Sequence, residues 1–156
     1  MFDLSGKIAL ITGASGGIGA AIARALHGRG ATVVLHGTRA ERLAELSGEL
    51  GKRTHVVTAN LSSREEAAGL IGFAAEAAGA PVTILVNNAG ITRDNLAMRM
   101  KDEEWDEVLN INMTAAMMIA RAALRPMIKA RYGRIISISS IVGFFRNLSI
   151  AVWPAD

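Results

Sequence analysis

A glycine-rich turn near the N-terminus has the residue types and the spacing to hold a diphosphate. It reads Thr12-Gly13-Ala14-Ser15-Gly16-Gly17-Ile18-Gly19, between an apolar run typical of a strand and the start of a helical pattern. Gly13 permits a tight turn, while Gly17 and Gly19 let a ligand and the strand approach the helix. The helix would offer unpaired N–H groups and a partial positive charge to the diphosphate. We therefore predict a dinucleotide-binding loop, the alternative being a strand-to-helix turn without a ligand. The predicted contacts are Gly13, Ser15, Gly16, Gly17, Ile18 and Gly19.

The end of the second apolar run indicates which dinucleotide would bind. It reads Leu35-His36-Gly37-Thr38-Arg39 and contains no acidic residue. An acid at this place usually holds a free ribose 2′-OH and would repel a 2′-phosphate, whereas Arg39 could pair with that phosphate through a charged fork. The sequence therefore favours NADPH over NADH. The alternative for Arg39 is a solvated residue at the start of a helix.

The elements that would carry these residues alternate along the chain. Apolar β-type runs separated by helical patterns predict βαβ units, an α/β fold and a Rossmann-like, doubly wound parallel sheet of about five strands. The first helix carries Ile18, Ile22 and Leu26 on one face, and the last is expected to kink at Pro126, which lacks a backbone donor. The expected strands are 7–12, 32–37, 54–59, 82–87 and 134–139, and the expected helices are 17–29, 39–50, about 62–78 and 102–130.

The bulk composition narrows the classes of function. The 156 residues are 51% hydrophobic and 20% charged, which is typical of one globular domain. No apolar run reaches the roughly 20 residues of a membrane span, and the N-terminus lacks the features of a signal peptide. We therefore expect a cytoplasmic protein that does not enter a membrane.

Metal and nucleic-acid sites are not expected either. The chain has no cysteine, and His27, His36 and His55 are scattered without ligand spacing. The isoelectric point is near 9.8, but the net charge is only +3 and the basic residues are spread along the chain. A mild positive field suits a phosphorylated cofactor or an acidic partner better than a nucleic acid.

Two motifs together resemble those of the short-chain dehydrogenase/reductase family. The glycine spacing Gly-x-x-x-Gly-x-Gly is followed, after the fourth apolar run, by Asn87-Asn88-Ala89-Gly90. The longer stretch from Asn87 to Leu96, continuing Met98-Arg99-Met100-Lys101, is similar to bacterial 3-oxoacyl-acyl carrier protein reductases. The resemblance implies the strand order 3-2-1-4-5. It also implies NADPH-dependent reduction of acyl carrier protein thioesters in fatty-acid biosynthesis, homo-oligomers for full-length relatives, and cofactor contacts by Asn60, Asn88, Ala89 and Gly90.

The resemblance also implies a catalytic set. In the family a tyrosine donates a proton, a lysine lowers its pKa, a serine binds the substrate carbonyl and an asparagine continues the proton relay. By position, Ser140 matches the serine and Asn112 the relay asparagine. The alternatives are a hydroxyl that closes a strand end and a helix-interior amide bonded to kinked backbone.

The tyrosine and the lysine have no counterpart in this sequence. The family spacing places the tyrosine at Trp153 and the lysine just past Asp156, whereas the single tyrosine is Tyr132 and the last lysine is Lys129. We therefore expect an incomplete NADP-binding domain at 1–143, an aberrant tail at 144–156, and C-terminal strands and helices of the family to be missing. Two interpretations remain open: an NADPH-dependent ketoreductase, or a catalytically inactive truncated fragment that retains at most nucleotide binding.

Overall fold

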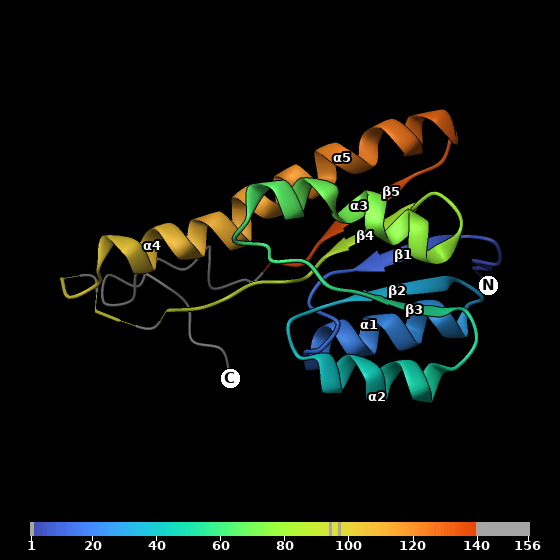
Figure 1. The fold of residues 1–156 in the computed structure, drawn as a ribbon, viewed down its shortest axis with the longest axis horizontal. Helices are drawn as coiled ribbons and strands as arrows, with labels where there is room; N and C mark the ends of the chain where they lie inside the picture. The colour runs from blue at the N-terminus through green and yellow to red at the C-terminus, as the bar shows by residue number, and fades with distance from the viewer. Residues whose placement is uncertain (1, 94, 97, 140–156) are drawn as a thin grey trace.

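A parallel sheet of five short strands forms the centre of the computed structural model, which describes residues 2–93, 95–96 and 98–139 (Figure 1). The order is β3-β2-β1-β4-β5, and every neighbouring pair is parallel. Both the α/β class and the predicted order are confirmed. The strands are β1 (Ile8–Ile11), β2 (Thr32–His36), β3 (Thr54–Val57), β4 (Ile84–Asn87) and β5 (Arg134–Ser137).

Helices cover both faces of the sheet, α1 and α2 on one face and α3 and α5 on the other (Figure 1). This two-sided cover explains why the strands are nearly continuous apolar runs. The helices are α1 (Gly17–Gly28), α2 (Ala40–Leu50), α3 (Arg64–Ala78), α4 (Asp102–Leu109), the π-helical turn η1 (Asn110–Ala115) and α5 (Ala116–Lys129).

Successive side chains of each strand point to opposite faces of the sheet, and this divides the core into two clusters. In β1, Leu10 packs with α3 and α5, while Ile11 packs with α1 and α2. In β2, Val34 and Leu35 separate in the same way. Because successive side chains of a strand point to opposite faces, each strand supports both helical layers.

The strand β4 begins at Ile84, two residues later than the predicted 82–87, and the Thr83 side chain just before it bonds to the first residue of β1. The Ile8 N–H donates to Thr83 Oγ1 at 3.1 Å, and that hydroxyl donates to Ile8 O at 3.3 Å. One hydroxyl thus joins the amino ends of the two central strands.

The long helical region is interrupted at a different place from the one expected. The sequence predicts a continuous helix over 102–130 with a kink at Pro126, whereas α5 continues through Pro126 and the irregular turn lies at Asn110–Ala115. The loss of one backbone donor does not end α5 here. Instead the helix widens where Asn112 bonds to a loop, as described below, and such π-turns are often functional.

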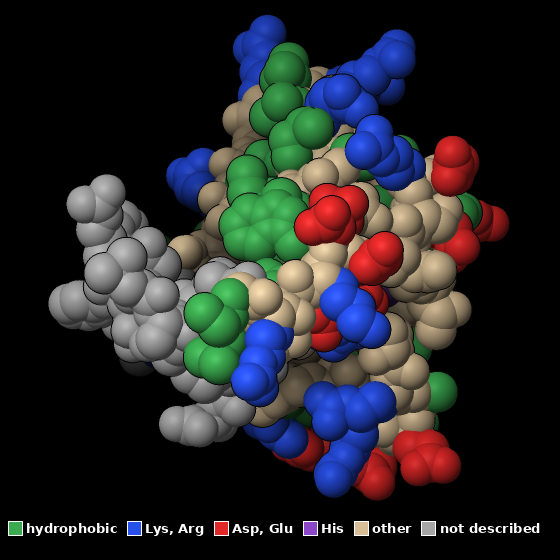
Figure 2. Space-filling view, turned by 90° about the vertical axis from the view of Figure 1, so that its left-hand side faces the viewer, with side chains coloured by type: hydrophobic (Ala, Val, Ile, Leu, Met, Phe, Trp, Pro, Cys, Tyr) green, Lys and Arg blue, Asp and Glu red, His purple; other side chains and the backbone are tan. Residues whose placement is uncertain are grey.

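The last strand and the α4–α5 region leave apolar side chains at the surface. The strand β5 lies at the sheet edge, and its Ile135 and Ile136 are partly exposed. Figure 2 shows hydrophobic side chains gathered over the α4 end of the molecule, beside basic and acidic ones. In the part of the chain that the structure describes, no helix combines the length and the hydropathy needed to cross a bilayer. The exposed apolar side chains of α4, η1 and α5 are Trp105, Met113, Met117, Leu124 and Ile128.

Candidate nucleotide-binding site

A cleft of about 600 Å³ lies where the carboxyl ends of the central strands meet the glycine loop. Strands β1 to β3 are added toward one edge of the sheet, and β4 and β5 toward the other edge, so β1 and β4 flank a topological switch point. Ligands of open α/β sheets bind at such a point. Eleven residues predicted from the sequence as cofactor contacts line this one cleft. They are Gly13, Ser15, Gly16, Gly17, Ile18, Gly19, Arg39, Asn60, Asn88, Ala89 and Gly90.

Two glycines of the loop allow backbone segments to touch. Gly13 has φ +68°, and a Cβ there would lie 2.9 Å from the Cα of Ala89. A Cβ on Gly19 would overlap the Gly13 carbonyl oxygen and lie 2.8 Å from Nδ2 of Asn88. Gly17 differs, because a Cβ there would meet no protein atom within 4 Å although the residue lines the cleft. Gly13 and Gly19 therefore serve the fold of the loop, while Gly17 keeps the surface of the cleft open.

The hydroxyl of Thr12 ties the glycine loop to the segment after β4. The N–H groups of Asn88 and Ala89 both donate to Thr12 Oγ1 at 3.0 Å, and this hydroxyl donates to Val86 O at 3.3 Å. The Asn88 side chain closes the same junction by donating to Thr12 O at 3.0 Å. Sequence reasoning missed Thr12, whose only signal is a hydroxyl at the end of a buried strand.

The N-terminus of α1 faces the cleft without a protein cap. Gly16 is its N-cap residue, and within the described residues no side chain accepts a hydrogen bond from this end. The first turn also contains no acidic residue. Uncapped N–H groups and the helix dipole make this a suitable place for an anion.

The side chain of Arg39 crosses the glycine loop. Its Nη2 donates to Ser15 O at 2.7 Å, and it lies 3.8 Å from the point where a Cβ on Gly16 would stand. The guanidinium therefore lies over the loop, although Arg39 is exposed and is also the N-cap residue of α2. A planar guanidinium has five donors, so this single bond leaves most of them free.

The end of β2 is packed tightly against the loop. The Ala14 N–H donates to His36 O at 2.8 Å, and a Cβ on Gly37 would lie 2.7 Å from Ser15 Oγ. The His36 ring is buried, and Nε2 lies 3.0 Å from Ala59 O. Because a carbonyl only accepts, Nε2 carries the proton of the neutral ring. Burial lowers the pKa of His36, so the ring stays neutral near pH 7.

Asn60 lines the cleft while it organises the turn before α3. Its Oδ1 accepts from the Ser62 N–H at 2.9 Å, and its own N–H donates to a Glu66 carboxylate oxygen at 2.7 Å. Ser63 caps α3 by accepting from the Glu66 N–H at 3.3 Å. Only the serine half of a capping box is therefore present, because the carboxylate of Glu66 accepts from the Asn60 N–H instead of from the Ser63 N–H.

Asn112 is bonded to the backbone of one distant residue. Its Oδ1 accepts from the Ile91 N–H at 2.8 Å, and its Nδ2 donates to Ile91 O at 2.9 Å. Ile91 lines the cleft, and Gly90 leaves room for the amide, since a Cβ there would lie 3.3 Å from Asn112 Oδ1. The π-helical turn thus holds the loop after β4, an arrangement that differs from the amide bonded to kinked helix backbone considered in the sequence analysis. Asn112 itself is not among the residues that line the cleft, and Ser140 lies outside the described residues.

Two further observations concern Ile18 and the metal-ligating side chains. Ile18 does not join the core with Ile22 and Leu26, because it is 63% exposed at the first turn of α1 and lines the cleft. Among residues 2–93, 95–96 and 98–139 no group of three or more metal-ligating side chains is found.

Comparison with known proteins agrees with this geometry. A model of the family described as short chain dehydrogenase matches residues 7–155. The chain belongs to the short-chain dehydrogenase family. The family predicted from the glycine loop and Asn87–Gly90 is therefore confirmed.

Individual members of the short-chain dehydrogenase family are similar over most of the chain. Nodulation protein G of Rhizobium sp. (strain N33) is 55% identical over 94% of this chain and 60% of its own length. The 3-oxoacyl-[acyl-carrier-protein] reductase of Rickettsia felis is 49% identical over 94% of this chain and 59% of its own length. The crystal structure of a short chain dehydrogenase from Mycobacterium smegmatis has a TM-score of 0.86 and 36% identity, covering 96% of this chain and 66% of that one. The chain spans about 60% of the length of the curated relatives it matches.

Proposed function

We propose that this chain binds NADPH in the cleft, with the diphosphate at the N-terminus of α1 and the 2′-phosphate near Arg39. The observation that carries the proposal is the convergence of the glycine loop, the uncapped end of α1 and the guanidinium of Arg39 on one cavity. Asn88, directly after β4, also lines the cleft. These residues fit a phosphorylated dinucleotide because they combine open backbone N–H groups with a cation, and no acid is among the residues that line the cleft.

For the activity we propose that of an oxidoreductase: NADPH-dependent reduction of 3-oxoacyl-acyl carrier protein to the 3-hydroxyacyl form in fatty-acid biosynthesis. The bound cofactor would supply the hydride. The support is the family, together with the similarity to a 3-oxoacyl-[acyl-carrier-protein] reductase. This chain would hold the loop after β4 with Asn112, and Ser140 would bind the substrate carbonyl. An acyl carrier protein thioester is thus the proposed partner, and a homo-oligomer the proposed assembly.

A second candidate is nucleotide binding without reduction, and the position of Tyr132 favours it. Tyr132 precedes β5 and lies under the ammonium of Lys7, which is 3.9 Å from the ring centroid. Lys7 precedes β1, so this pair lies at the amino ends of the parallel strands, opposite the cleft. Tyr132 therefore cannot donate a proton to a substrate there, and the last lysine, Lys129, ends α5.

Two measurements on the 156-residue chain test both candidates. NADPH and NADH are titrated by fluorescence, and we expect NADPH to bind at least about tenfold more tightly because of its charge-assisted bonds to arginine. NADPH oxidation is then followed with an acetoacetyl thioester. Turnover above the protein-free rate would establish the reductase, and binding without turnover would establish the second candidate. Failure to bind either nucleotide would overturn the proposed cofactor site.

A further inference from the structure

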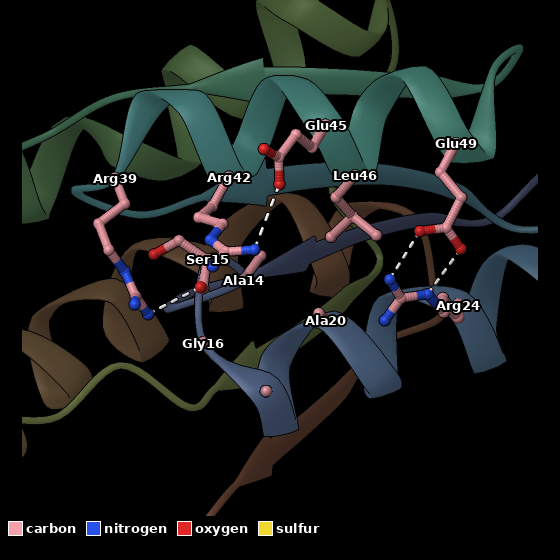
Figure 3. Close-up of a pocket in the computed structure, with 11 residues that line it drawn as sticks. Ala14, Ser15, Gly16, Ala20, Arg24, Arg39, Arg42, Glu45, Leu46 and Glu49 are labelled. Atoms are coloured by element: carbon pink, nitrogen blue, oxygen red, sulfur yellow. Dashed lines mark hydrogen bonds and ion pairs between the residues drawn. The ribbon is translucent and has the colours of Figure 1, made fainter.

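A second groove, of about 390 Å³, runs between α1 and α2 and joins the cleft at the glycine loop (Figure 3). The two cavities share Ser15, Gly16, Gly17 and Arg39. The groove therefore begins at the end of the cleft where β2 and the loop meet. Any group of a ligand that extends past Arg39 would enter it.

The groove carries three arginines with different partners. Arg24 is paired with both carboxylate oxygens of Glu49, at 2.7 and 2.6 Å, and this pairing holds the pKa of Glu49 below its ordinary value. Arg42 has one long contact of 3.4 Å with Glu45, and both side chains are 67% exposed. Exposed contacts of this kind contribute little, so Arg42 is available for a better partner.

Arg39 and Arg42 both extend from the start of α2 into this groove, where Arg39 reaches Ser15 and Arg42 turns toward Glu45 (Figure 3). Within the described residues no carboxylate lies within salt-bridge distance of Arg39, whose hydrogen bond goes to Ser15 O. The shared end of the two cavities therefore has an excess of positive charge. A phosphate monoester carries close to two negative charges near neutral pH and several acceptor oxygens, so one guanidinium would neutralise it incompletely.

We propose that Arg42 is a second cation for the 2′-phosphate of NADPH, beside Arg39, and that Glu45 weakens this binding by competing for Arg42. The inference rests on the proposed cofactor site and adds a specificity-determining residue to it. Gly16 contributes indirectly, because the absence of a side chain there leaves the space beneath the Arg39 guanidinium open to a ligand.

The test compares dissociation constants of NADPH and NADH for the unmodified chain and three variants. Arg42→Gln should weaken NADPH binding about five- to tenfold and change NADH binding less than about twofold, because only NADPH carries the 2′-phosphate. Glu45→Gln should strengthen NADPH binding by about two- to threefold, since it removes a competing carboxylate. Arg24→Gln is the matched control, because Arg24 lies in the same groove but is already paired with Glu49. This variant should leave the ratio of the NADPH and NADH dissociation constants unchanged.

The outcomes separate this inference from the proposed function. If NADPH is preferred over NADH and Arg42→Gln keeps the full preference, Arg42 is not a ligand, while the cofactor site stands. If Arg42→Gln and Arg24→Gln reduce the preference equally, the preference for NADPH comes from the overall positive electrostatic field of the groove, and the inference fails. If the unmodified chain binds neither nucleotide, both proposals fail.

Discussion

Alanine substitution at three glycines of α1 tests the account of the loop, because the three differ in what a new methyl group would meet. At Gly19 it would overlap the Gly13 carbonyl oxygen and lie 2.8 Å from Asn88 Nδ2. At Gly17 and Gly28 it would meet no protein atom within 4 Å. Gly17 lines the cleft and Gly28 does not, so the set separates an effect on folding from an effect on binding.

The magnitudes follow from opposing terms. Replacing glycine by alanine within a helix stabilises by about 0.5–1 kcal/mol, which is the expectation for Gly28→Ala. Gly19→Ala has the same gain but an overpacking cost of about 2–3 kcal/mol, the upper part of the usual range, because its obstacle is backbone that cannot rotate away. The net loss of about 1–2.5 kcal/mol should lower the melting temperature by roughly 2–10 °C in a chain of this size.

The assay combines thermal unfolding with NADPH titration. Gly28→Ala should melt slightly higher and bind normally. Gly17→Ala should melt no lower than the unmodified chain yet bind NADPH at least about tenfold more weakly, because the methyl group would stand between the diphosphate and the helix N–H groups. Gly19→Ala should lose both stability and binding. The reasoning is refuted if Gly19→Ala melts and binds like the unmodified chain, or if Gly17→Ala binds NADPH unchanged.

Three further predictions concern buried or bridging polar groups. Thr12→Val should lower the free energy of unfolding by about 2–3 kcal/mol, since two N–H groups lose their acceptor; Thr12→Ser should recover most of this in denaturant unfolding, and equal losses would contradict the role of the hydroxyl. Burial lowers the pKa of His36 in the folded chain, so below about pH 6.5 the unfolded chain binds a proton more readily than the folded chain does. The free energy of unfolding therefore decreases as the pH is lowered, by at most about 1.4 kcal/mol per pH unit. His36→Gln should flatten the dependence of melting temperature on pH between about 5 and 7, and an unchanged slope would exclude His36 as its cause. Asn112→Ala should accelerate amide hydrogen exchange in the loop that follows Ile91, with a local loss of about 1 kcal/mol; unchanged exchange would show that the loop is held by other contacts.

Much of the fold follows from local patterns. Apolar runs flanked by glycine and by helical periodicity predicted all five strands, because strands covered on both faces are apolar throughout and the exposed edge strand β5 still carries Ile135 and Ile136. The predicted bounds of the strands were less accurate, because contacts with distant residues affect where a strand begins and ends. Thr83 has the β-branched shape of a strand residue, but its hydroxyl bonds to the end of β1 and β4 starts after it.

In the candidate site, too, local patterns predicted some residues, while the roles of others depend on distant contacts. The glycine loop, Arg39 and Asn88 were predicted from residue types at the ends of apolar runs, and they line one cleft. The roles of Thr12 and Gly37 were missed, because each depends on contact with a residue that is distant along the chain. The π-helical turn at Asn110–Ala115 was missed for the same reason, because it accompanies the contact of Asn112 with the distant Ile91.

The residue pattern alone predicted the class of fold, the family and eleven of the residues that line the cleft, because periodicity and turn chemistry act over a few neighbouring residues. The tertiary structure decided which partner each polar group has. Thr12 bonds to Asn88 across 76 positions and Asn112 to Ile91 across 21. Such contacts arise only when crossover connections bring strand ends and helices together. For the same reason the groove that brings Arg42 beside Arg39 next to the loop became visible only in the folded chain.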